Sequence, residues 1–412
     1  MHSRTIIVAG AGIGGLTTAL ALAQAGFRLE VLDQAERLEP TGAGLQLSPN
    51  ASRLLIALGL GERLKPVVVS PTAIRVIAAR TAREILRVPL GAAAEKRYGA
   101  PYWVIHRGDL HAALLAAASE HPDISLQLGR KVDAFAIHPN GVTVHATRRG
   151  ETAESFGIAL VGADGLWSNV RAQLVDHLPP RFAKRVAWRA TVPADRVAAE
   201  FREPIVHLWL GRDSHLVHYP VNALRTVNIV AIAQDSSQDS SQGFSQDSWR
   251  QQDWSAPANP AEVLARFSAR DWSAPTRALL EAPQSFLKWA LFDRPPLRRW
   301  GRGPVTLVGD AAHPMLPFLA QGAAMAIEDA AVLAACIGKP PTQIRPMLAT
   351  AMRNYEEKRR ARTADIQRGA RINAALYHLG WPAAQVRNRT LARIGGENFL
   401  RRFDWIYDWK PT

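Results

Sequence analysis

Three glycines near the N-terminus have the spacing that brings a polypeptide backbone close to a phosphate group. Gly10, Gly12 and Gly15 lie in the segment Gly-Ala-Gly-Ile-Gly-Gly, after the β-branched run Thr5–Ala9 and before the Leu- and Ala-rich run Leu16–Ala25. Glycine at the first two positions permits a sharp turn and a close approach to a pyrophosphate, and the third lets the helix pack on the strand. The helix N-terminus adds free N–H groups and the positive end of its dipole. The segment therefore predicts a dinucleotide-binding strand, turn and helix.

Asp33 is the acidic side chain that we expect to bind the ribose of such a ligand. A carboxylate is expected about 20 residues after the glycines, and both Glu30 and Asp33 lie near that position. In strand alternation Glu30 shares a face with Leu32, whereas Asp33 ends the strand at its carboxyl edge. The ligand would lie at that edge, so Asp33 is the predicted ribose contact.

A second glycine and aspartate follow an apolar strand late in the chain. The run Val305–Val308 leads into Gly309 and Asp310, and Gln321-Gly322-Ala323-Ala324 opens a later helix. The glycine permits a close approach, and the end of the later helix could stabilise negative charge on a bound ring system. An aspartate that only caps a helix is the alternative interpretation.

A third motif, Gly162-Ala-Asp164-Gly165, again follows an apolar strand and continues to Arg171. An Asp-Gly pair taken alone is typical of a turn. From the residues alone, a turn is therefore the preferred interpretation of this motif.

Two histidines occupy one predicted strand but opposite faces of it. Residues 206–221 indicate two strands joined near 211–214. Side-chain alternation places His215 and Tyr219 on one face and His218 on the other. Histidine transfers protons near neutral pH, so His215 is a candidate for acid–base chemistry. Ordinary half-buried strand residues are the alternative.

The order of elements predicts an α/β protein with an inserted sheet. A strand, helix and strand cover residues 4–33, a helix capped by Asp109 lies within 102–120, and short strands follow between 125 and 161 with a hairpin turn at Asn140-Gly141. Residues 182–300 are mainly strands, after which the chain returns to a buried strand and ends in helices. The Ser-, Gln- and Asp-rich segment Gln234–Ser248 predicts a flexible surface loop.

The composition indicates a globular protein. The 412 residues are 47% hydrophobic and 21% charged, and no run of about 18 apolar residues predicts a membrane helix. The apolar N-terminal stretch is interrupted by glycines, so a secretory signal is not expected. The single cysteine, Cys336, excludes an internal disulfide and disfavours a cysteine-built metal cluster. We therefore expect a cytoplasmic protein with no metal site.

The net charge of +14 raises the question of nucleic-acid binding. The excess arginines are spread along the chain, and the densest basic run, Lys358–Arg362, follows two glutamates in a predicted polar helix. A solvated helix face explains that run better than a binding stripe does. We predict no nucleic-acid partner, and the charge could instead draw anionic substrates and cofactors to the protein.

The three motifs, in this order and at these separations, resemble those of the single-component flavoprotein monooxygenases. That family includes para-hydroxybenzoate hydroxylase, salicylate hydroxylase and 6-hydroxynicotinate 3-monooxygenase. The resemblance covers nearly the whole chain, and the stretch from Gly309 to Asp329 is its most specific part. Gly42–Asn50 is similar to a second flavin-contacting loop of the family, and His106–Leu110 to the segment whose arginine touches the cofactor.

The resemblance implies a set of cofactor-contacting residues at positions that match the family motifs. They are Gly10, Gly12, Gly15 and Asp33 for the ADP half of FAD, Asp310 for its pyrophosphate and ribityl region, Gln46 and Arg107 as braces, the backbone N–H groups of Gly322 and Ala323 for the flavin pyrimidine edge, and Asp164 for both FAD and NAD(P)H. FAD would be bound non-covalently. No second glycine fingerprint indicates a separate nicotinamide domain, and NADH and NADPH both remain open as electron donors.

The resemblance also implies the reaction. NAD(P)H reduces FAD, dioxygen adds to give a flavin C4a-hydroperoxide, and this species hydroxylates an electron-rich aromatic ring. His215 would accept or relay the phenolic proton, and Tyr219 would hydrogen-bond the substrate. The expected substrate is a small phenolic or N-heteroaromatic acid, with salicylate-like, hydroxybenzoate-like and hydroxynicotinate-like compounds all open. No single arginine is identified as the carboxylate anchor, and packing is the expected role of Trp188 and Arg189.

The predicted architecture follows from the resemblance and the order of elements together. Residues 1–180 would form the first part of a Rossmann-like FAD-binding domain, residues 181–300 an inserted, mainly antiparallel β-sheet substrate domain, and residues 301–412 the completion of the FAD-binding domain with C-terminal helices. A homodimer is left open.

Two other functions stay in competition at this stage. One is a flavin-dependent oxidase or dehydrogenase that uses the same FAD fold without inserting oxygen. The other is a non-catalytic, basic binding protein on a vestigial FAD fold. The intact glycines and aspartates of the motifs argue against the second.

Overall fold

The N-terminal segment forms the predicted strand, helix and strand in the computed structural model, which describes residues 4–38, 43–175, 178–235, 255–339 and 345–411. These elements are β1 (Thr5–Ala9), α1 (Ile13–Gln24) and β2 (Arg28–Asp33). They belong to a parallel sheet of five strands with the order β18-β11-β1-β2-β7. The other three strands are β7 (Ile124–Leu128), β11 (Ala159–Gly162) and β18 (Val305–Leu307).

The parallel sheet explains how the three motifs meet. The glycine fingerprint follows β1, the Asp164 motif follows β11, and Asp310 comes shortly after β18. These three strands are neighbours in the sheet and run in the same direction, so their carboxyl ends lie at one edge. A crevice at the carboxyl edge of a parallel sheet is where α/β folds bind their ligands.

Helices pack against this sheet and against one another. α1 lies between α5 (Arg107–Glu120) and α9 (Gly322–Ile337), and α10 (Arg345–Tyr377) packs along α9. The expected cap at Asp109 is wrong, because α5 begins at Arg107 and its N-cap is His106. The His106 ring accepts a hydrogen bond from the backbone N–H of Gly108 at 3.2 Å, so the helix starts before the aspartate is reached.

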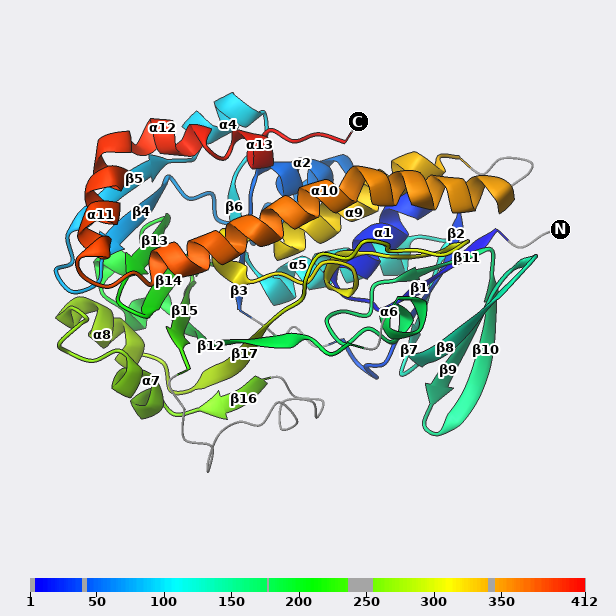
Figure 1. Cartoon of the computed structure of the whole chain (residues 1–412), viewed down its shortest axis with the longest axis horizontal. Coiled ribbons are helices and arrows are strands. Elements are labelled where there is room, and N and C mark those ends of the chain that lie inside the picture. The colour runs from blue at the N-terminus through cyan, green and yellow to red at the C-terminus, as the bar shows by residue number, and fades with distance from the viewer. Residues whose placement is uncertain (1–3, 39–42, 176–177, 236–254, 340–344, 412) are drawn as a thin grey trace.

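The predicted short strands form an antiparallel sheet that projects from the parallel one (Figure 1). It consists of β8 (Lys131–His138), β9 (Gly141–Arg148) and β10 (Glu151–Gly157), in the order β10-β9-β8. A tight turn at Pro139-Asn140 joins β8 and β9, one residue earlier than the predicted Asn140-Gly141, and Gly141, the first residue of β9, has a φ of +141°.

A large, mainly antiparallel sheet forms the other end of the molecule. Its eight strands have the order β16-β17-β12-β15-β14-β13-β4-β5. They are β4 (Ala73–Ala78), β5 (Glu84–Pro89), β12 (Arg181–Pro193), β13 (Ile205–Leu210), β14 (Ser214–Val221), β15 (Thr226–Gln234), β16 (Ser255–Ala258) and β17 (Phe286–Asp293). The sequence did not indicate that β4 and β5, from well before residue 181, complete this sheet. β4 pairs with β13 in parallel.

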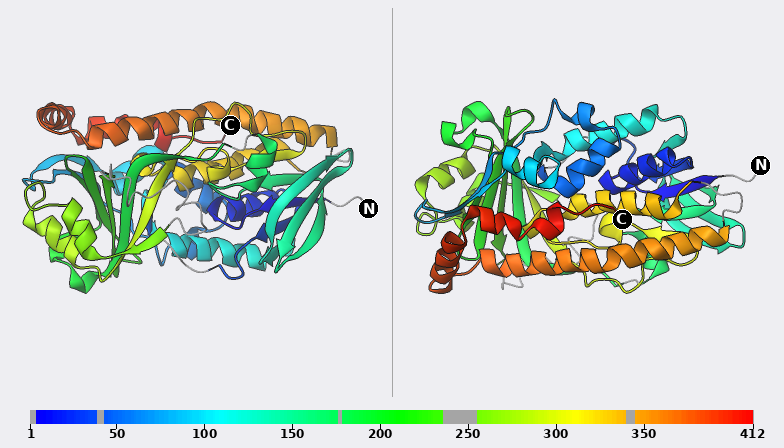
Figure 2. Two further views of the ribbon diagram at one scale, coloured as in Figure 1. Left: turned by 60° about the horizontal axis from the view of Figure 1, so that its bottom comes forward. Right: turned by 90° about the horizontal axis from the view of Figure 1, so that it is seen from above.

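The two faces of the large sheet have different neighbours. On one face α7 (Pro260–Arg266) and α8 (Ala274–Glu281) cover an apolar cluster that includes Trp188, Leu216 and Phe267. On the other face, residues such as Ala187 and Ile232 pack against Phe318 and the end of α10. Figures 1 and 2 show α10 running along the molecule, from the parallel-sheet end to the large sheet.

The remaining described elements connect these layers. They are β3 (Gly44–Leu47), α2 (Pro49–Ala57), α3 (Gly61–Leu64), α4 (Ala92–Tyr98), β6 (Trp103–His106), α6 (Asn169–Leu174), α11 (Ala383–Ile394), α12 (Gly396–Arg401), α13 (Asp404–Tyr407) and the short 3-10 helices η1 (Ala194–Arg196), η2 (Ala199–Phe201), η3 (Gly309–Ala311) and η4 (Pro317–Leu319). Of the predicted surface loop, residues 236–248 lie outside the described ranges. None of the described helices is both long and apolar enough to span a bilayer.

Candidate active site

The three fingerprint glycines face different surroundings. A Cβ at Gly10 would lie 2.4 Å from the carbonyl oxygen of Ala163, and one at Gly15 would lie 1.8 Å from that of Gly10. A Cβ at Gly12 would meet no atom within 4 Å. The first and third glycines are therefore required by packing of the protein itself, whereas the second leaves open space at the N-terminus of α1. A ligand phosphate could approach the backbone there.

Asp33 holds the glycine loop from the neighbouring strand. Its Oδ2 accepts a hydrogen bond from the backbone N–H of Ala11 at 2.7 Å, and its Oδ1 accepts one from Ala35 at 2.8 Å. The side chain is only partly buried. The carboxylate therefore orders the loop between Gly10 and Gly12 and retains an accessible edge at the crevice.

Asp310 lies enclosed by protein and still reaches solvent. Its side chain is exposed, yet the surrounding protein raises the pKa of its carboxyl by desolvation, which the charges of His313 and Arg107 oppose. Burial also lowers the pKa of the Arg107 guanidinium, and Asp310 opposes that shift. Asp310 and Arg107 therefore lie near each other, although they are far apart in the sequence, at the edge of the parallel sheet where a ligand cleft is expected.

The helix α9 joins the first and second motifs. A Cβ at Gly14 would lie 3.3 Å from the Cβ of Ala326, and one at Gly309 would lie 3.2 Å from the same atom. Both glycine segments thus pack on one patch of α9, about one turn from its first residues, Gly322 and Ala323. The N–H groups of a helix's first turn have no partner within the helix, so these two residues present donors at the edge of the cleft.

A buried ionic network fixes the loop that carries Asp310. Oδ2 of Asp329 accepts hydrogen bonds from the backbone N–H of Gly309 at 2.9 Å and from Nε2 of His313 at 2.5 Å. Arg359 of α10 donates to Asp329 at 2.7 Å and to Glu328 at 2.5 Å. These charges lower the pKa of Asp329 to about 2 even though its burial acts in the opposite direction. His313 is accordingly a structural residue of this loop.

Asp164 uses its carboxylate within its own motif. Oδ1 accepts a hydrogen bond from the Ser168 hydroxyl at 2.5 Å, and Oδ2 accepts one from the backbone N–H of Val170 at 3.0 Å. Burial raises the pKa of this carboxyl, and the hydrogen bonds oppose the shift. The aspartate therefore shapes the turn before α6, and the neighbouring Ala163 in turn packs on Gly10.

Gln46 and Tyr219 lie together where the FAD-binding region meets the large sheet. Oε1 of Gln46 accepts a hydrogen bond from the hydroxyl of Tyr102 at 2.7 Å, and a hydrogen bond with Gln46 opposes the rise in the pKa of Tyr219 that burial causes. A Cβ at Gly44 would lie 2.6 Å from the Tyr219 ring. Oδ1 of Asn228 accepts a hydrogen bond from the Gly44 N–H at 2.6 Å, which clamps the β3 strand onto the sheet.

His215 and His218 face opposite sides of β14, as alternation predicts. His215 contacts Phe318 and Tyr377, with ring centroids 5.2 and 5.4 Å away, on the face that meets α10. His218 stacks on His207 with centroids 4.4 Å apart, on the face toward Phe201 of η2. His215 therefore shares its side of the sheet with Tyr219, and His218 does not.

Arg189, for which the sequence predicted only packing, lies on the same face of the large sheet as His215 and Tyr219. It alternates with Trp188 on β12 and places its guanidinium 5.2 Å from the Trp289 ring centroid, on the face of the sheet that carries His215 and Tyr219. Burial lowers the pKa of Arg189, Tyr219 opposes that shift, and the charge of Arg107 adds to it. Among the described residues no carboxylate lies within ion-pair distance of Arg189. An arginine next to a tryptophan in sequence looks like packing, and only the sheet register places it here.

These features fit FAD as the bound group. Open space at Gly12 lies at the N-terminus of one helix, Gly322 and Ala323 begin another, and the accessible carboxylates of Asp33 and Asp310 can accept hydrogen bonds from hydroxyl groups. The two helix ends suit phosphates and an electron-rich ring, and the carboxylates suit ribose and ribityl hydroxyls.

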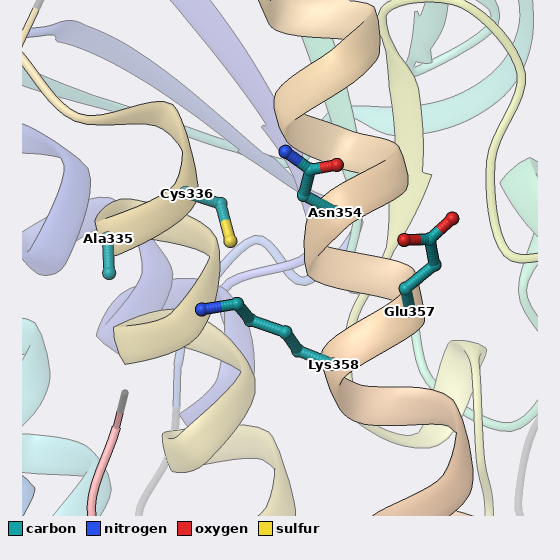
Figure 3. Close-up of a pocket in the computed structure, with 5 residues that line it drawn as sticks. All are labelled: Ala335, Cys336, Asn354, Glu357 and Lys358. Carbon is teal, nitrogen blue, oxygen red and sulfur yellow. The ribbon is translucent and has the colours of Figure 1, made fainter.

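A surface pocket on the outer side of α9 is separate from this cleft. It has a volume of about 580 Å³ and is lined by Ala335, Cys336, Asn354, Glu357 and Lys358. Figure 3 shows these residues on two adjacent helices, α9 and α10. Cys336 lies about 20 Å along α9 from the cleft, at 1.5 Å per residue, and burial raises the pKa of its thiol. The pocket shares no residue with the three motifs.

Comparisons with known proteins agree with this geometry. The family model described as FAD binding domain matches residues 3–370. A 3-hydroxybenzoate 6-hydroxylase of Aquipseudomonas alcaligenes is 35% identical over 408 residues, which cover 99% of this chain and 98% of that protein. A 6-hydroxynicotinate 3-monooxygenase of Bordetella bronchiseptica is 33% identical over 372 residues, covering 90% and 91% of the two chains. A solved salicylate hydroxylase substrate complex has a TM-score of 0.81 at 26% identity, covering 99% of this chain and 96% of its own. The chain belongs to the family of FAD-dependent aromatic hydroxylases.

Proposed function

We propose that the protein hydroxylates a small phenolic or N-heteroaromatic acid, with NAD(P)H as electron donor and dioxygen as oxidant. The observation that carries the proposal is the face of the large sheet opposite the FAD cleft. It combines His215 and Tyr219 with Arg189, a cation that has no acidic partner in the described chain. Bound FAD would supply the redox chemistry that activates dioxygen, and the protein's own residues bind and orient the aromatic acid.

The hydroxyl end of the substrate lies near His215 and Tyr219 in this proposal. Both side chains are buried on one face of β14, four residues apart. Burial raises the pKa of Tyr219, so its hydroxyl stays protonated at neutral pH and can donate a hydrogen bond. Loss of the phenolic proton pushes electron density into the ring carbons, so contacts that favour the phenolate favour reaction with an electrophilic oxygen.

The carboxylate end lies near Arg189. A guanidinium forms two parallel hydrogen bonds with a carboxylate, which gives orientation as well as affinity. Arg107 has Asp310 nearby, whereas Arg189 has only the Trp289 ring. A bound acid would supply the missing counter-charge, and the overall positive charge of the protein would draw that acid toward the site.

An apolar wall closes the remaining side of this region. Phe318 and Leu316 are buried against Ala187 and Ile232 of the sheet, together with Ala374 of α10. Such a wall excludes water, which protects a reactive oxygen donor and favours its transfer to the ring over its release as hydrogen peroxide.

A substrate screen tests the proposed reaction. Hydroxybenzoates and hydroxypyridine carboxylic acids are added separately to the purified FAD-loaded protein, and NADH and NADPH oxidation, oxygen uptake and product are measured. We expect one compound class to stimulate oxidation with a hydroxylated product formed in nearly equal amount. NAD(P)H oxidation that yields no hydroxylated product with any compound would favour an oxidase or dehydrogenase instead.

The carboxylate anchor is tested with matched ligands. Arg189→Met should weaken binding of the substrate acid by about 10- to 100-fold, the value of a lost charged hydrogen bond. The same variant should bind the corresponding carboxamide or unsubstituted phenol about as well as the parent protein does. Arg189→Lys should recover part of the loss. An equal loss for the acid and the neutral ligand would show that Arg189 only supports packing.

A cytoplasmic location and the open question of a homodimer belong to the proposal as well. The first rests on the single cysteine, and light scattering of the FAD-loaded protein tests the second.

A further inference from the structure

His215 is the middle of a hydrogen-bonded chain whose outer members come from distant parts of the sequence. Nδ1 of His215 lies 2.8 Å from Nε2 of His378, the residue that follows α10. Nε of Arg185, on β12, donates to Nδ1 of His378 at 3.3 Å. The carbonyl of His378 accepts a hydrogen bond from the Asp213 N–H at 3.2 Å, so its backbone is fixed to the turn before β14.

The far nitrogen of His215 keeps a small accessible surface although the residue as a whole is buried. Nε2 of His215 makes no hydrogen bond to any described residue, and it is not among the enclosed, unpartnered nitrogens of the chain. Both ring nitrogens of His218, in contrast, are enclosed without partners. Nε2 of His215 is therefore the atom that a ligand on the Tyr219 face would meet.

The hydrogen bond from Arg185 determines which ring nitrogen carries the proton in His378 and in His215. A guanidinium N–H can only donate, because arginine keeps its charge in proteins. Nδ1 of His378 must therefore accept, and a neutral His378 carries its proton on Nε2. That proton points at Nδ1 of His215, which must accept in turn. A neutral His215 then carries its own proton on Nε2, the nitrogen that is not bonded to His378.

The surroundings keep both rings neutral. Burial, His378 and Arg185 hold the pKa of His215 well below its usual value. Burial, Arg185 and Arg387 lower that of His378 to about 3. Asp213 acts on Arg185, whose pKa its charge raises against the effect of burial, and burial raises the pKa of Tyr377 beside His215 to about 12. No described carboxylate contacts either imidazole to stabilise a positive charge on it.

We propose that Arg185 and His378 are positioning residues that hold His215 with its proton on Nε2, so that His215 donates a hydrogen bond to the oxygen of an already ionised substrate. The site then binds the phenolate and releases the phenolic proton to solvent as the ligand enters. The O–H bond of the phenol breaks, its electron pair stays on oxygen, and no side chain of the chain Arg185–His378–His215 gains a proton. This inference rests on the proposed function, because it requires a phenolic ligand at His215.

The test uses a coloured phenol that is bound without turnover. 3-Hydroxy-4-nitrobenzoate is added to the oxidised, FAD-loaded protein, without NAD(P)H, at a pH below the phenol's own pKa. We expect the absorbance of the phenolate and release of close to one proton per bound ligand, measured with an indicator in weak buffer. Binding as the neutral phenol, or binding without proton release, would overturn the donor role of His215.

Two substitutions at His378 give opposite predictions. Glutamine places an amide N–H where Nε2 of His378 lies, so His378→Gln should keep the bound ligand ionised. Glutamate accepts a hydrogen bond from Nδ1 of His215, so the proton of a neutral His215 moves from Nε2 to Nδ1 and Nε2 becomes a hydrogen-bond acceptor. Such an acceptor favours a ligand that keeps its phenolic O–H, so His378→Glu should lower the ratio of bound phenolate to phenol about tenfold and abolish proton release to solvent. Identical ligand spectra in the two variants would contradict the proposal.

Substitutions at two arginines near His378 distinguish the effect of a hydrogen bond to its ring from the effect of a nearby positive charge. Arg387 also lowers the pKa of His378, but it donates to the carbonyls of Leu376 and Tyr377 and not to the His378 ring. Arg185→Met should reduce ionisation of the bound phenol, and Arg387→Met should leave it nearly unchanged. Equal effects of the two variants would overturn the role of Arg185. FAD content and thermal midpoint report folding of each variant. Failure of every phenolic acid to bind would reject the proposed function itself, and this inference with it.

Discussion

At the scale of single residues, the candidate site depends on charges that the protein leaves without full compensation. Asp310 is accessible but desolvated, so its charge is unfavourable until a partner arrives. Arg189 is enclosed without a carboxylate. Groups of this kind reduce the stability of the free protein and increase its affinity for a ligand of the right polarity. His218 is not expected to bind a ligand in this way, because its unpartnered nitrogens face only protein.

Asp310→Ala should separate the effect of this charge on stability from its effect on FAD affinity. FAD affinity should fall by about 10- to 100-fold, because a carboxylate that accepts hydrogen bonds from cofactor hydroxyls is lost. The free energy of unfolding of the FAD-free chain should stay the same or rise, since a desolvated charge is removed. FAD titration and urea unfolding of the apoprotein measure these quantities, with Asp195→Ala, a substitution of an exposed acid in η1, as the control. Unchanged FAD affinity would remove Asp310 from the site.

At the scale of the element, the alternation of side chains along β14 places its two histidines in different surroundings. His215 points to the face that carries Tyr219 and meets α10, and His218 points into a buried cluster with His207 and Phe201. Burial, with Arg75 next in size, lowers the pKa of His207 from 6.5 to about 4, and Arg87 and Glu84 act weakly in opposite senses. Burial, His207 and Arg75 lower the pKa of His218 as well.

This histidine pair predicts loss of stability in acid. The unfolded chain binds protons near pH 6.5, whereas the folded chain excludes them from His207 until about pH 4. Stability contributed by the neutral pair is therefore complete above about pH 6.5 and falls as the pH drops toward 4, by up to about 1.4 kcal/mol per pH unit for each histidine. Urea midpoints between pH 7.5 and 4.5 should show a smaller slope for His218→Phe than for the parent protein. The same slope in both proteins would contradict the assignment.

At the scale of the whole molecule, α10 connects the cofactor region to the substrate face. Near its middle, Arg359 binds Glu328 and Asp329 and so holds the loop of Gly309 and His313. At its end, the chain passes through Tyr377 to His378, which contacts His215. The helix therefore sets the position of both the FAD loop and the imidazole chain (Figure 2).

Arg359→Met should lower both the stability of the fold and the retention of FAD. Removing the guanidinium leaves Glu328 and Asp329 buried with too little compensation, which should cost about 3 to 5 kcal/mol in the free energy of unfolding. FAD retention should also fall, because Asp329 positions Gly309 and His313. The neighbouring Arg360, whose side chain is 48% exposed, provides the control, and Arg360→Met should cost less than about 1 kcal/mol. Similar losses for the two variants would show that the buried network is not what stabilises α10.

Local pattern was sufficient for the nucleotide-binding half of the protein. The spacing of Gly10, Gly12 and Gly15, the strand before them and Asp33 at the end of β2 are short-range features, because a strand, turn and helix take their geometry from residues close in sequence. Side-chain alternation likewise predicted that His215 and His218 point to opposite faces of β14. The cap of α5 was misplaced because His106, an uncommon capping residue, occupies the position ahead of Asp109.

Tertiary structure alone decided which distant residues meet. β4 joins the large sheet through a parallel pairing with β13, and no turn motif in the sequence indicates this pairing. Arg189 faces the candidate site only because of the register of β12 with β15. His378 reaches His215 across 163 positions of sequence. Nothing in the residues around His378 marks it, since the contact is set by the length and direction of α10. Whether Nε2 of His215 donates or accepts a hydrogen bond depends on that contact. This is the physical reason why the sequence, from which we expected a residue that accepts or relays a proton, could name the residue but not its tautomer.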